Sequence, residues 1–194
     1  MATFTLTDEP AWVSRLLSIP LNDATPVMLS NHIYWNLGAF VDESALTILN
    51  NTLHMPYADR IIDVDGILIP TGGINITNGT AYDFTTPHTI GRDTPLLSNS
   101  CGTGCQGYDN AFILDRPRWA LEDPDLEVLT LSAPSTGIKM SLSSNQQGLQ
   151  IYSCVGQNGY IPVKESQKHG NDTHVEKFGC VVIETQDVSI IVRV

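Results

Sequence analysis

The sequence predicts an all-β protein, built mostly from antiparallel strands in a single domain. Three observations lead to this prediction. Short runs rich in Val, Ile, Leu, Thr and Tyr alternate with clusters of Gly, Pro, Asn and Asp. Helical periodicity is weak, and several prolines fall between the apolar runs, where a missing amide donor does no harm. A chain of 194 residues also suffices for one domain with its own core.

Eight segments have the composition of strands, and residues 138–143 alternate most clearly between a buried and a wet face. Pro10 and Pro20 closely bracket residues 12–17, so a strand fits there better than a helix. In chain order, the predicted strands are Thr3–Leu6, Val13–Ile19, Ala45–Leu53, Phe112–Leu114, Leu126–Leu131, Ile138–Ser143, Gly148–Ser153 and Val181–Thr185. This pattern favours an antiparallel sandwich.

Charge and hydropathy limit the class of partner. The formal net charge of −11 makes nucleic acid and phosphorylated ligands unfavourable partners, whereas a neutral sugar suits this balance. We expect no membrane partner, because no apolar run approaches the ~18 residues that a spanning helix needs. The first ten residues lack the basic and apolar regions of a secretory signal.

The four cysteines leave two interpretations open. Cys101 and Cys105 could close a small loop, to which we assign a structural role, but free or partly buried thiols are slightly favoured for the set. No zinc-type pairing is present, so we expect no metal. Sequons begin at Asn50, Asn75, Asn78 and Asn171, and they matter only in the secretory pathway, so the compartment stays open.

Two motifs carry the chemistry. Glu184 ends the apolar run that starts at Cys180, and His32 lies among amides and aromatics in residues 31–37. A desolvated carboxylate and an imidazole that converge can move two protons in one reaction. Taken alone, a glutamate at the end of a strand, such as Glu184, more often faces solvent. A single histidine such as His32 is more often a core residue whose hydrogen bonds are made within the protein.

With its motifs in order, the chain resembles the aldose 1-epimerase (galactose mutarotase) family. The resemblance covers most of the chain, to about residue 187. It rests on four segments: Leu29-Ser30-Asn31-His32-Ile33-Tyr34-Trp35-Asn36-Leu37; Ile69-Pro70-Thr71-Gly72 with Asp83-Phe84 and Ile90-Gly91; Gly107-Tyr108-Asp109-Asn110-Ala111-Phe112-Ile113-Leu114; and Gly148-Leu149-Gln150-Ile151-Tyr152 with Val182-Ile183-Glu184-Thr185-Gln186. The ordered set is far more specific than any one segment.

The resemblance implies a galactose-mutarotase-like β-supersandwich, here incomplete, with a partial domain over residues 1–187 and an atypical tail over 188–194. The family's upstream glycine-arginine motif and second histidine do not appear in this sequence. The implied activity interconverts the α and β anomers of hexoses such as galactose and glucose, without a cofactor. The alternatives are a hexose-phosphate epimerase, a non-catalytic sugar-binding or inactive fragment, and a supersandwich domain detached from a larger carbohydrate enzyme, which the intact glutamate motif disfavours.

The resemblance also implies roles for individual residues. Glu184 is the expected catalytic base and His32 the expected acid. Asp109, Asn31 and Gln150 are expected to bind the sugar, although Asp109 also fits a turn. Asn31 and Asn36 could fix the His32 tautomer or line the site. Tyr34 and Trp35 fit sugar stacking and core packing equally well.

Overall fold

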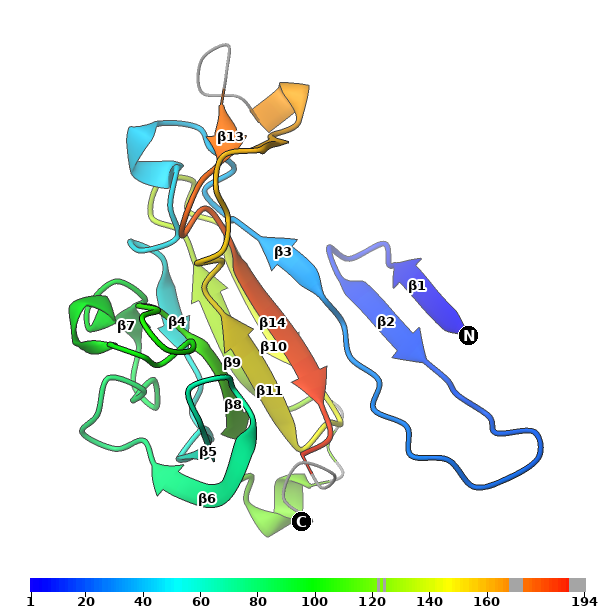
Figure 1. The fold of residues 1–194 in the computed structure, drawn as a ribbon. Coiled ribbons are helices and arrows are strands. Elements are labelled where there is room, and N and C mark those ends of the chain that lie inside the picture. The colour runs from blue at the N-terminus through cyan, green and yellow to red at the C-terminus, as the bar shows by residue number, and fades with distance from the viewer. Residues whose placement is uncertain (122, 124, 168–172, 189–194) are drawn as a thin grey trace.

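The computed structural model describes residues 1–121, 123, 125–167 and 173–188, and within them the protein is a two-sheet β structure (Figure 1). All pairings between the described strands are antiparallel. The larger sheet has the strand order β3 (Ile33–Trp35), β14 (Val181–Gln186), β11 (Gly148–Tyr152), β8 (Asp109–Ile113), β5 (Arg60–Val64) and β6 (Pro70–Ile76). The smaller sheet has the order β10 (Lys139–Ser143), β9 (Glu127–Ser132), β4 (Thr52–His54) and β7 (His88–Thr89). The predicted all-β, antiparallel class is therefore confirmed.

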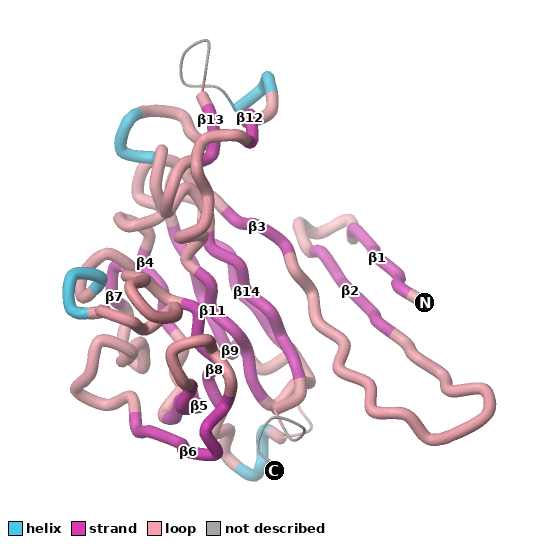
Figure 2. Tube along the Cα trace, in the orientation of Figure 1, coloured by secondary structure: helices cyan, strands magenta, loops and turns pink. Residues whose placement is uncertain are grey.

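Two short hairpins and four short helical turns complete the described part. The hairpins are β1 (Ala2–Leu6) with β2 (Trp12–Leu16), and β12 (Ile161–Pro162) with β13 (His174–Val175). The turns are 3-10 helices: η1 (Glu43–Ala45), η2 (Thr94–Leu96), η3 (Arg118–Ala120) and η4 (Glu165–Gln167). Figure 2 shows how little of the chain is helical.

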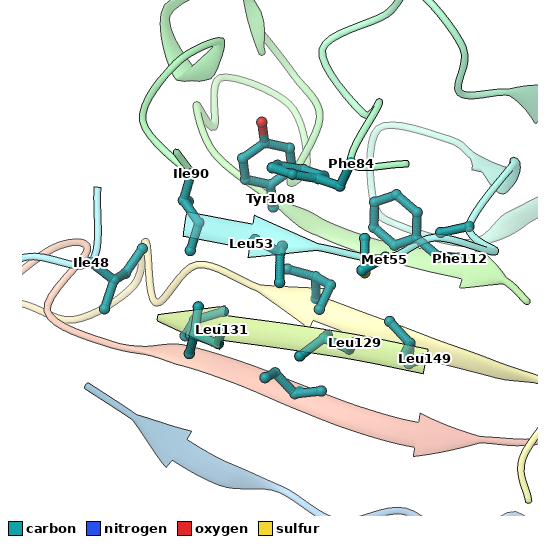
Figure 3. Packing of buried hydrophobic residues seen from close by; sticks show 14 of the residues in the cluster. Ile48, Leu53, Met55, Phe84, Ile90, Tyr108, Phe112, Leu129, Leu131 and Leu149 are labelled. Atoms are coloured by element: carbon teal, nitrogen blue, oxygen red, sulfur yellow. The ribbon is translucent and has the colours of Figure 1, made fainter. Parts of the chain in front are cut away.

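The core lies between the two sheets. Alternate residues of β8, β11 and β14 turn inward and join this core, namely Phe112, Leu149, Ile151, Val181 and Ile183. Figure 3 shows Phe112 and Leu149 of the larger sheet near Leu53, Leu129 and Leu131 of the smaller one. Residues outside the strands complete this cluster and are almost fully buried: Ile48, Met55, Phe84, Ile90 and Tyr108. The opposite face of the larger sheet carries polar side chains beside a second, smaller apolar cluster of Ile62, Ala111, Ile113 and Val188.

The N-terminal hairpin of β1 and β2 differs from this body. Among the described elements, β1 and β2 contact only each other. Figures 1 and 2 show the hairpin beside the body, joined to β3 by a long loop. Its large apolar side chains remain exposed, including Phe4, Leu6, Trp12 and Val13. A strand was predicted over both segments, and both form, although β2 ends at Leu16 rather than Ile19.

One predicted strand is largely wrong. Residues 45–51 form the end of a helical turn followed by bends and a turn, and strand β4 begins only at Thr52. Asp42 caps the turn, because its carboxylate accepts hydrogen bonds from the Ala45 N–H and the Ser44 hydroxyl. The Ile48 N–H donates to the distant carbonyl of Phe178 at 2.8 Å, a tertiary bond that local composition does not reveal. The sequence interpretation also missed β3, β5 and β6 and the two-residue strands β7, β12 and β13, and β8 begins earlier than predicted, at Asp109.

All four cysteines are paired, which corrects the favoured thiol interpretation. Cys101 bonds Cys105, and Cys154 bonds Cys180. The second bridge joins Cys154, two residues after β11, to Cys180, the residue before β14, so it links two neighbouring strands of the larger sheet. The Cys101–Cys105 bond closes the small loop that the sequence left open as one of two interpretations, and its structural role stays a prediction.

The predicted tail falls largely outside the described residues, which end at 188. Val188 itself is buried against Ile62, Ala111 and Ile113. The division of the chain at residue 187 stays a prediction. Among the described residues, no helix is long and apolar enough to cross a bilayer.

Candidate active site

The candidate site lies on the face of the larger sheet that is turned away from the core, which we call the outer face. Strand register places its residues in two rows. Gln150 pairs with Glu184, and its neighbour on the other side is Ala111. Tyr152 pairs with Val182 and Asp109, and Val182 pairs with Tyr34. Because paired residues point to the same face, four strands bring their polar side chains together here.

His32 and Glu184 meet on the outer face. Nε2 of His32 lies 3.5 Å from Oε1 of Glu184. His32 directly precedes β3, and β3 pairs with β14, so the register of these two strands creates the contact. The His32 side chain is 53% exposed and that of Glu184 only 19%. The imidazole is thus accessible to a ligand while the carboxylate is largely shielded.

Burial shifts the Glu184 carboxyl toward the properties of a base. Desolvation raises its pKa above the ordinary value, and the nearby Asp109 carboxylate adds to the rise. The charge of His32 acts in the opposite direction, but burial prevails. A carboxylate with a raised pKa holds a proton more readily, which improves its capacity for general-base chemistry.

Asp109 and Gln150 form the second half of the cluster. Nε2 of Gln150 donates a hydrogen bond to Oδ1 of Asp109 at 2.6 Å. Burial raises the pKa of Asp109, while the Gln150 bond and the charge of His32 lower it in part. The Gln150 bond fixes one oxygen of the carboxylate, and the group remains an acceptor for a hydroxyl.

The residues around Asp109 explain its position in a strand rather than in the turn that its sequence also fits. Gly107 has a φ of +145°, and a Cβ there would lie 2.3 Å from the Val155 side chain. Only glycine therefore allows the chain to enter β8 by this path. The buried Asn110 donates to the Ser100 carbonyl and accepts from the Asp109 N–H, which ties the strand to the disulfide loop.

The two asparagines beside His32 have different positions. Nδ2 of Asn36 donates to the carbonyls of Ala45 and Gly179, each at 3.0 Å, and its Oδ1 accepts from the Gly38 N–H. Asn36 therefore holds three backbone segments together, rather than lining the sugar site or fixing the His32 tautomer. Asn31 is partly buried and directly precedes His32, and its sugar-binding role stays a prediction.

The structure separates the two aromatics of the same motif. Tyr34 is half-exposed on the outer face, and its ring centroid lies 5.1 Å from that of His32. Trp35 packs against the core between the sheets. Strand alternation produces this difference, and it was not evident because β3 was not predicted. Tyr152 also belongs to the outer face, where its hydroxyl accepts from the Gly156 N–H at 2.8 Å.

The described residues contain no group of three or more metal-ligating side chains close enough to hold an ion. The chemistry of this cluster is that of proton transfer and hydroxyl binding, with one imidazole, two carboxylates of raised pKa and one amide.

Comparison with known proteins places the chain in a family. Residues 2–192 match the model of the aldose 1-epimerase family, and the chain belongs to this family of isomerases. The chain is 46% identical to a probable aldose 1-epimerase from Arthroderma benhamiae, over 92% of this chain and 44% of that protein. It is also similar to the human galactose mutarotase, with 38% identity over 48% of this chain and 24% of the relative.

Solved structures agree on the fold. A GalM/aldose epimerase homologue from C. elegans superposes with a TM-score of 0.59 at 23% identity, covering 82% of this chain and 42% of that one. Galactose 1-epimerase from Lactobacillus acidophilus gives a TM-score of 0.55 at 21% identity. The chain thus has the galactose-mutarotase-like fold, and it spans less than half the length of the relatives described here.

Proposed function

We propose that this chain forms part of an aldose 1-epimerase that interconverts the α and β anomers of a neutral hexose such as galactose or glucose. The observation that carries the proposal is the contact between His32 and Glu184 on the outer face, beside Asp109 and Gln150. Family membership supports the reaction class, and the net charge of −11 favours a neutral sugar over a phosphorylated one.

The geometry suits ring opening because the two oxygens that exchange protons are bonded to the same sugar carbon. Glu184 takes the proton of the hydroxyl on C1 while protonated His32 delivers a proton to the ring oxygen. The bond from C1 to the ring oxygen breaks, and a carbonyl forms at C1. An acid and a base only 3.5 Å apart can serve both oxygens of one such carbon.

Ring closure reverses these proton movements. After rotation about the bond between C1 and C2, the ring oxygen attacks the other face of the carbonyl. His32 takes back the ring-oxygen proton and Glu184 returns one to the new C1 hydroxyl. No proton or electron is gained or lost, so the reaction requires no redox group.

The remaining polar residues are proposed to hold the sugar. Asp109 would accept a hydrogen bond from a sugar hydroxyl, and Gln150 would orient that carboxylate and offer its own amide oxygen. Asn31 lies next to the acid, where its amide would reach a neighbouring hydroxyl. The exposed ring of Tyr34, beside His32, offers an apolar surface for the sugar ring.

Polarimetry on freshly dissolved α-galactose tests the proposal. Two proteins should be assayed. The first is the 194-residue chain alone. The second is a fusion, which we call the extended chain, in which the upstream part of the Arthroderma relative precedes the 194-residue chain. A rate above the buffer rate in the extended chain, lost in a Glu184→Gln variant of it, is the expected result. Galactose binding without any acceleration would favour the non-catalytic sugar-binding alternative, and neither binding nor acceleration would reject both.

A further inference from the structure

The two disulfides indicate the compartment in which this fold is completed. All four cysteines are paired, and such bonds form and persist in oxidising surroundings such as the lumen of the endoplasmic reticulum. In eukaryotes, N-linked glycans are attached to asparagine sequons in the same lumen. The sequons matter only if the chain passes through the secretory pathway, and the paired cysteines support that passage.

The described sequons differ in exposure. The sequon at Asn50 continues into Asn51, which is 3% exposed, and the sequon at Asn75 ends at the fully buried Thr77. Asn78, Gly79 and Thr80 are all exposed. The fourth sequon, at Asn171, lies outside the described residues. Residues 78–80 are thus the one described sequon with three exposed residues.

Local geometry also favours Asn78. Residues 77–80 form a turn in which the Thr80 N–H donates to the Thr77 carbonyl at 3.0 Å. Gly79 has a φ of +73°, and a Cβ built on it meets no atom within 4 Å, so the turn projects into open space. The amide of Asn75 donates to Asp63 at 3.2 Å, whereas within the described residues the Asn78 amide makes no such bond.

The turn lies at the end of an unprotected sheet edge. Strand β6 is the last strand of the larger sheet, and its outer edge has no partner among the described strands. Ile74 and Ile76 on this strand are 37% and 70% exposed. An exposed apolar edge strand is a template for pairing with another chain, and natural proteins block such edges.

We propose that Asn78 carries an N-linked glycan, and that this glycan shields the unpaired edge of β6. A glycan is bulky and hydrophilic, and Asn78 follows β6 by only two residues. A sugar chain at this point sterically hinders a second copy from adding a strand along the edge. The proposal is independent of the epimerase function.

The chemistry of attachment balances with one co-substrate, an oligosaccharide joined through pyrophosphate to a polyisoprenoid lipid. A host oligosaccharyltransferase catalyses the step. Nδ2 of Asn78 attacks C1 of the first sugar, the bond from C1 to the phosphate oxygen breaks, and the lipid pyrophosphate leaves. The amide nitrogen loses one proton to solvent, and no atom changes oxidation state.

Peptide mapping of the full chain, directed into the endoplasmic reticulum of a eukaryotic host by a cleavable leader, tests the site. We expect two disulfides and a glycan on Asn78 that peptide N-glycosidase removes, leaving Asp at that position. Asn78→Gln and Thr80→Ala should both lose it. Thr80→Ser is the matched control, because it keeps the sequon and the hydroxyl that donates to the Thr77 carbonyl at 2.6 Å. A disulfide-bonded protein unmodified at Asn78, or modified only at Asn50 or Asn75, would overturn the proposal.

Light scattering of the secreted proteins tests the shielding. Asn78→Gln should associate at lower concentration than the glycosylated protein, and adding Ile76→Lys to it should restore the monomer, because a charge on an edge strand opposes pairing. Ile76→Lys leaves the sequon at Asn75 intact. Equal association with and without the glycan would reject the shielding role.

Discussion

The N-terminal hairpin and the centre of the larger sheet are built from similar strands, but only one of them is buried. Strands β1 and β2 pair over five residues each and contact no other described element, whereas β11 has strand partners on both sides and an apolar core beneath it. Local pairing is therefore enough to define a strand. Fixing a side chain for chemistry requires in addition the packing that β11 and β14 have.

The sharpest test of this contrast is the catalytic effect of matched glutamates. In the extended chain, Glu184→Gln should lower the mutarotation rate by about 10²–10⁴-fold, the usual contribution of one general acid or base. Glu9→Gln, in the exposed turn of the hairpin, should leave the rate unchanged. Polarimetry on α-galactose gives both values, and a near-normal rate for Glu184→Gln would remove Glu184 from the mechanism.

Core truncation should separate the two regions by stability. Leu149 of β11 is fully buried, so Leu149→Ala should lower the free energy of unfolding by about 2–5 kcal/mol. Val13 of β2 is 51% exposed, and Val13→Ala should change it by less than about 0.5 kcal/mol. Urea unfolding followed by circular dichroism measures both. Similar losses would show that the hairpin is packed in solution.

The two disulfides should differ by the length of chain that they close. Cys154 and Cys180 are 26 positions apart and Cys101 and Cys105 only 4. Chain-entropy reasoning gives about 3–4 kcal/mol for the longer loop and about 2 kcal/mol for the shorter one. Replacing each pair by alanine, with urea unfolding as the measurement, should reproduce this order. The reverse order would point to residual structure in the unfolded chain.

The smallest effect concerns pH and the two carboxyls of the site. Because the folded-state pKa values of Glu184 and Asp109 are raised, their contribution to stability is present below their ordinary pKa values and is lost as pH rises through the raised ones. A Glu184→Gln, Asp109→Asn double variant should therefore gain stability relative to the parent between about pH 4 and pH 7. Urea unfolding at both pH values measures the gain, and no change would mean that neither carboxyl is desolvated.

The fold class was predictable because strand periodicity is local. Strand β10 alternates cleanly along Lys139–Ser143, and its prediction differs from the structure by one residue. The strand prediction for residues 45–51 was wrong because a cap from Asp42 and a long-range hydrogen bond from Ile48 to Phe178 override their apolar composition. The Cys154–Cys180 disulfide was not predicted because it too depends on long-range contacts: the two cysteines are adjacent only through the pairing of β11 with β14.

The candidate site was predictable in its members but not in its contacts. The motifs identified His32 and Glu184, yet only the pairing of β3 with β14 brings them within 3.5 Å. The bond from Gln150 to Asp109 is a diagonal contact between neighbouring strands, which residue spacing does not reveal. The catalytic and binding roles themselves remain proposals.

The Cys154–Cys180 bridge has a consequence for proteolysis. Everything between the two cysteines, including the exposed Lys164, belongs to a covalently closed ring. A protease that cuts after Lys164 would open this ring without releasing either piece. The nicked molecule would keep β11 cross-linked to β14 and would migrate as a single species until a reductant separated it into two.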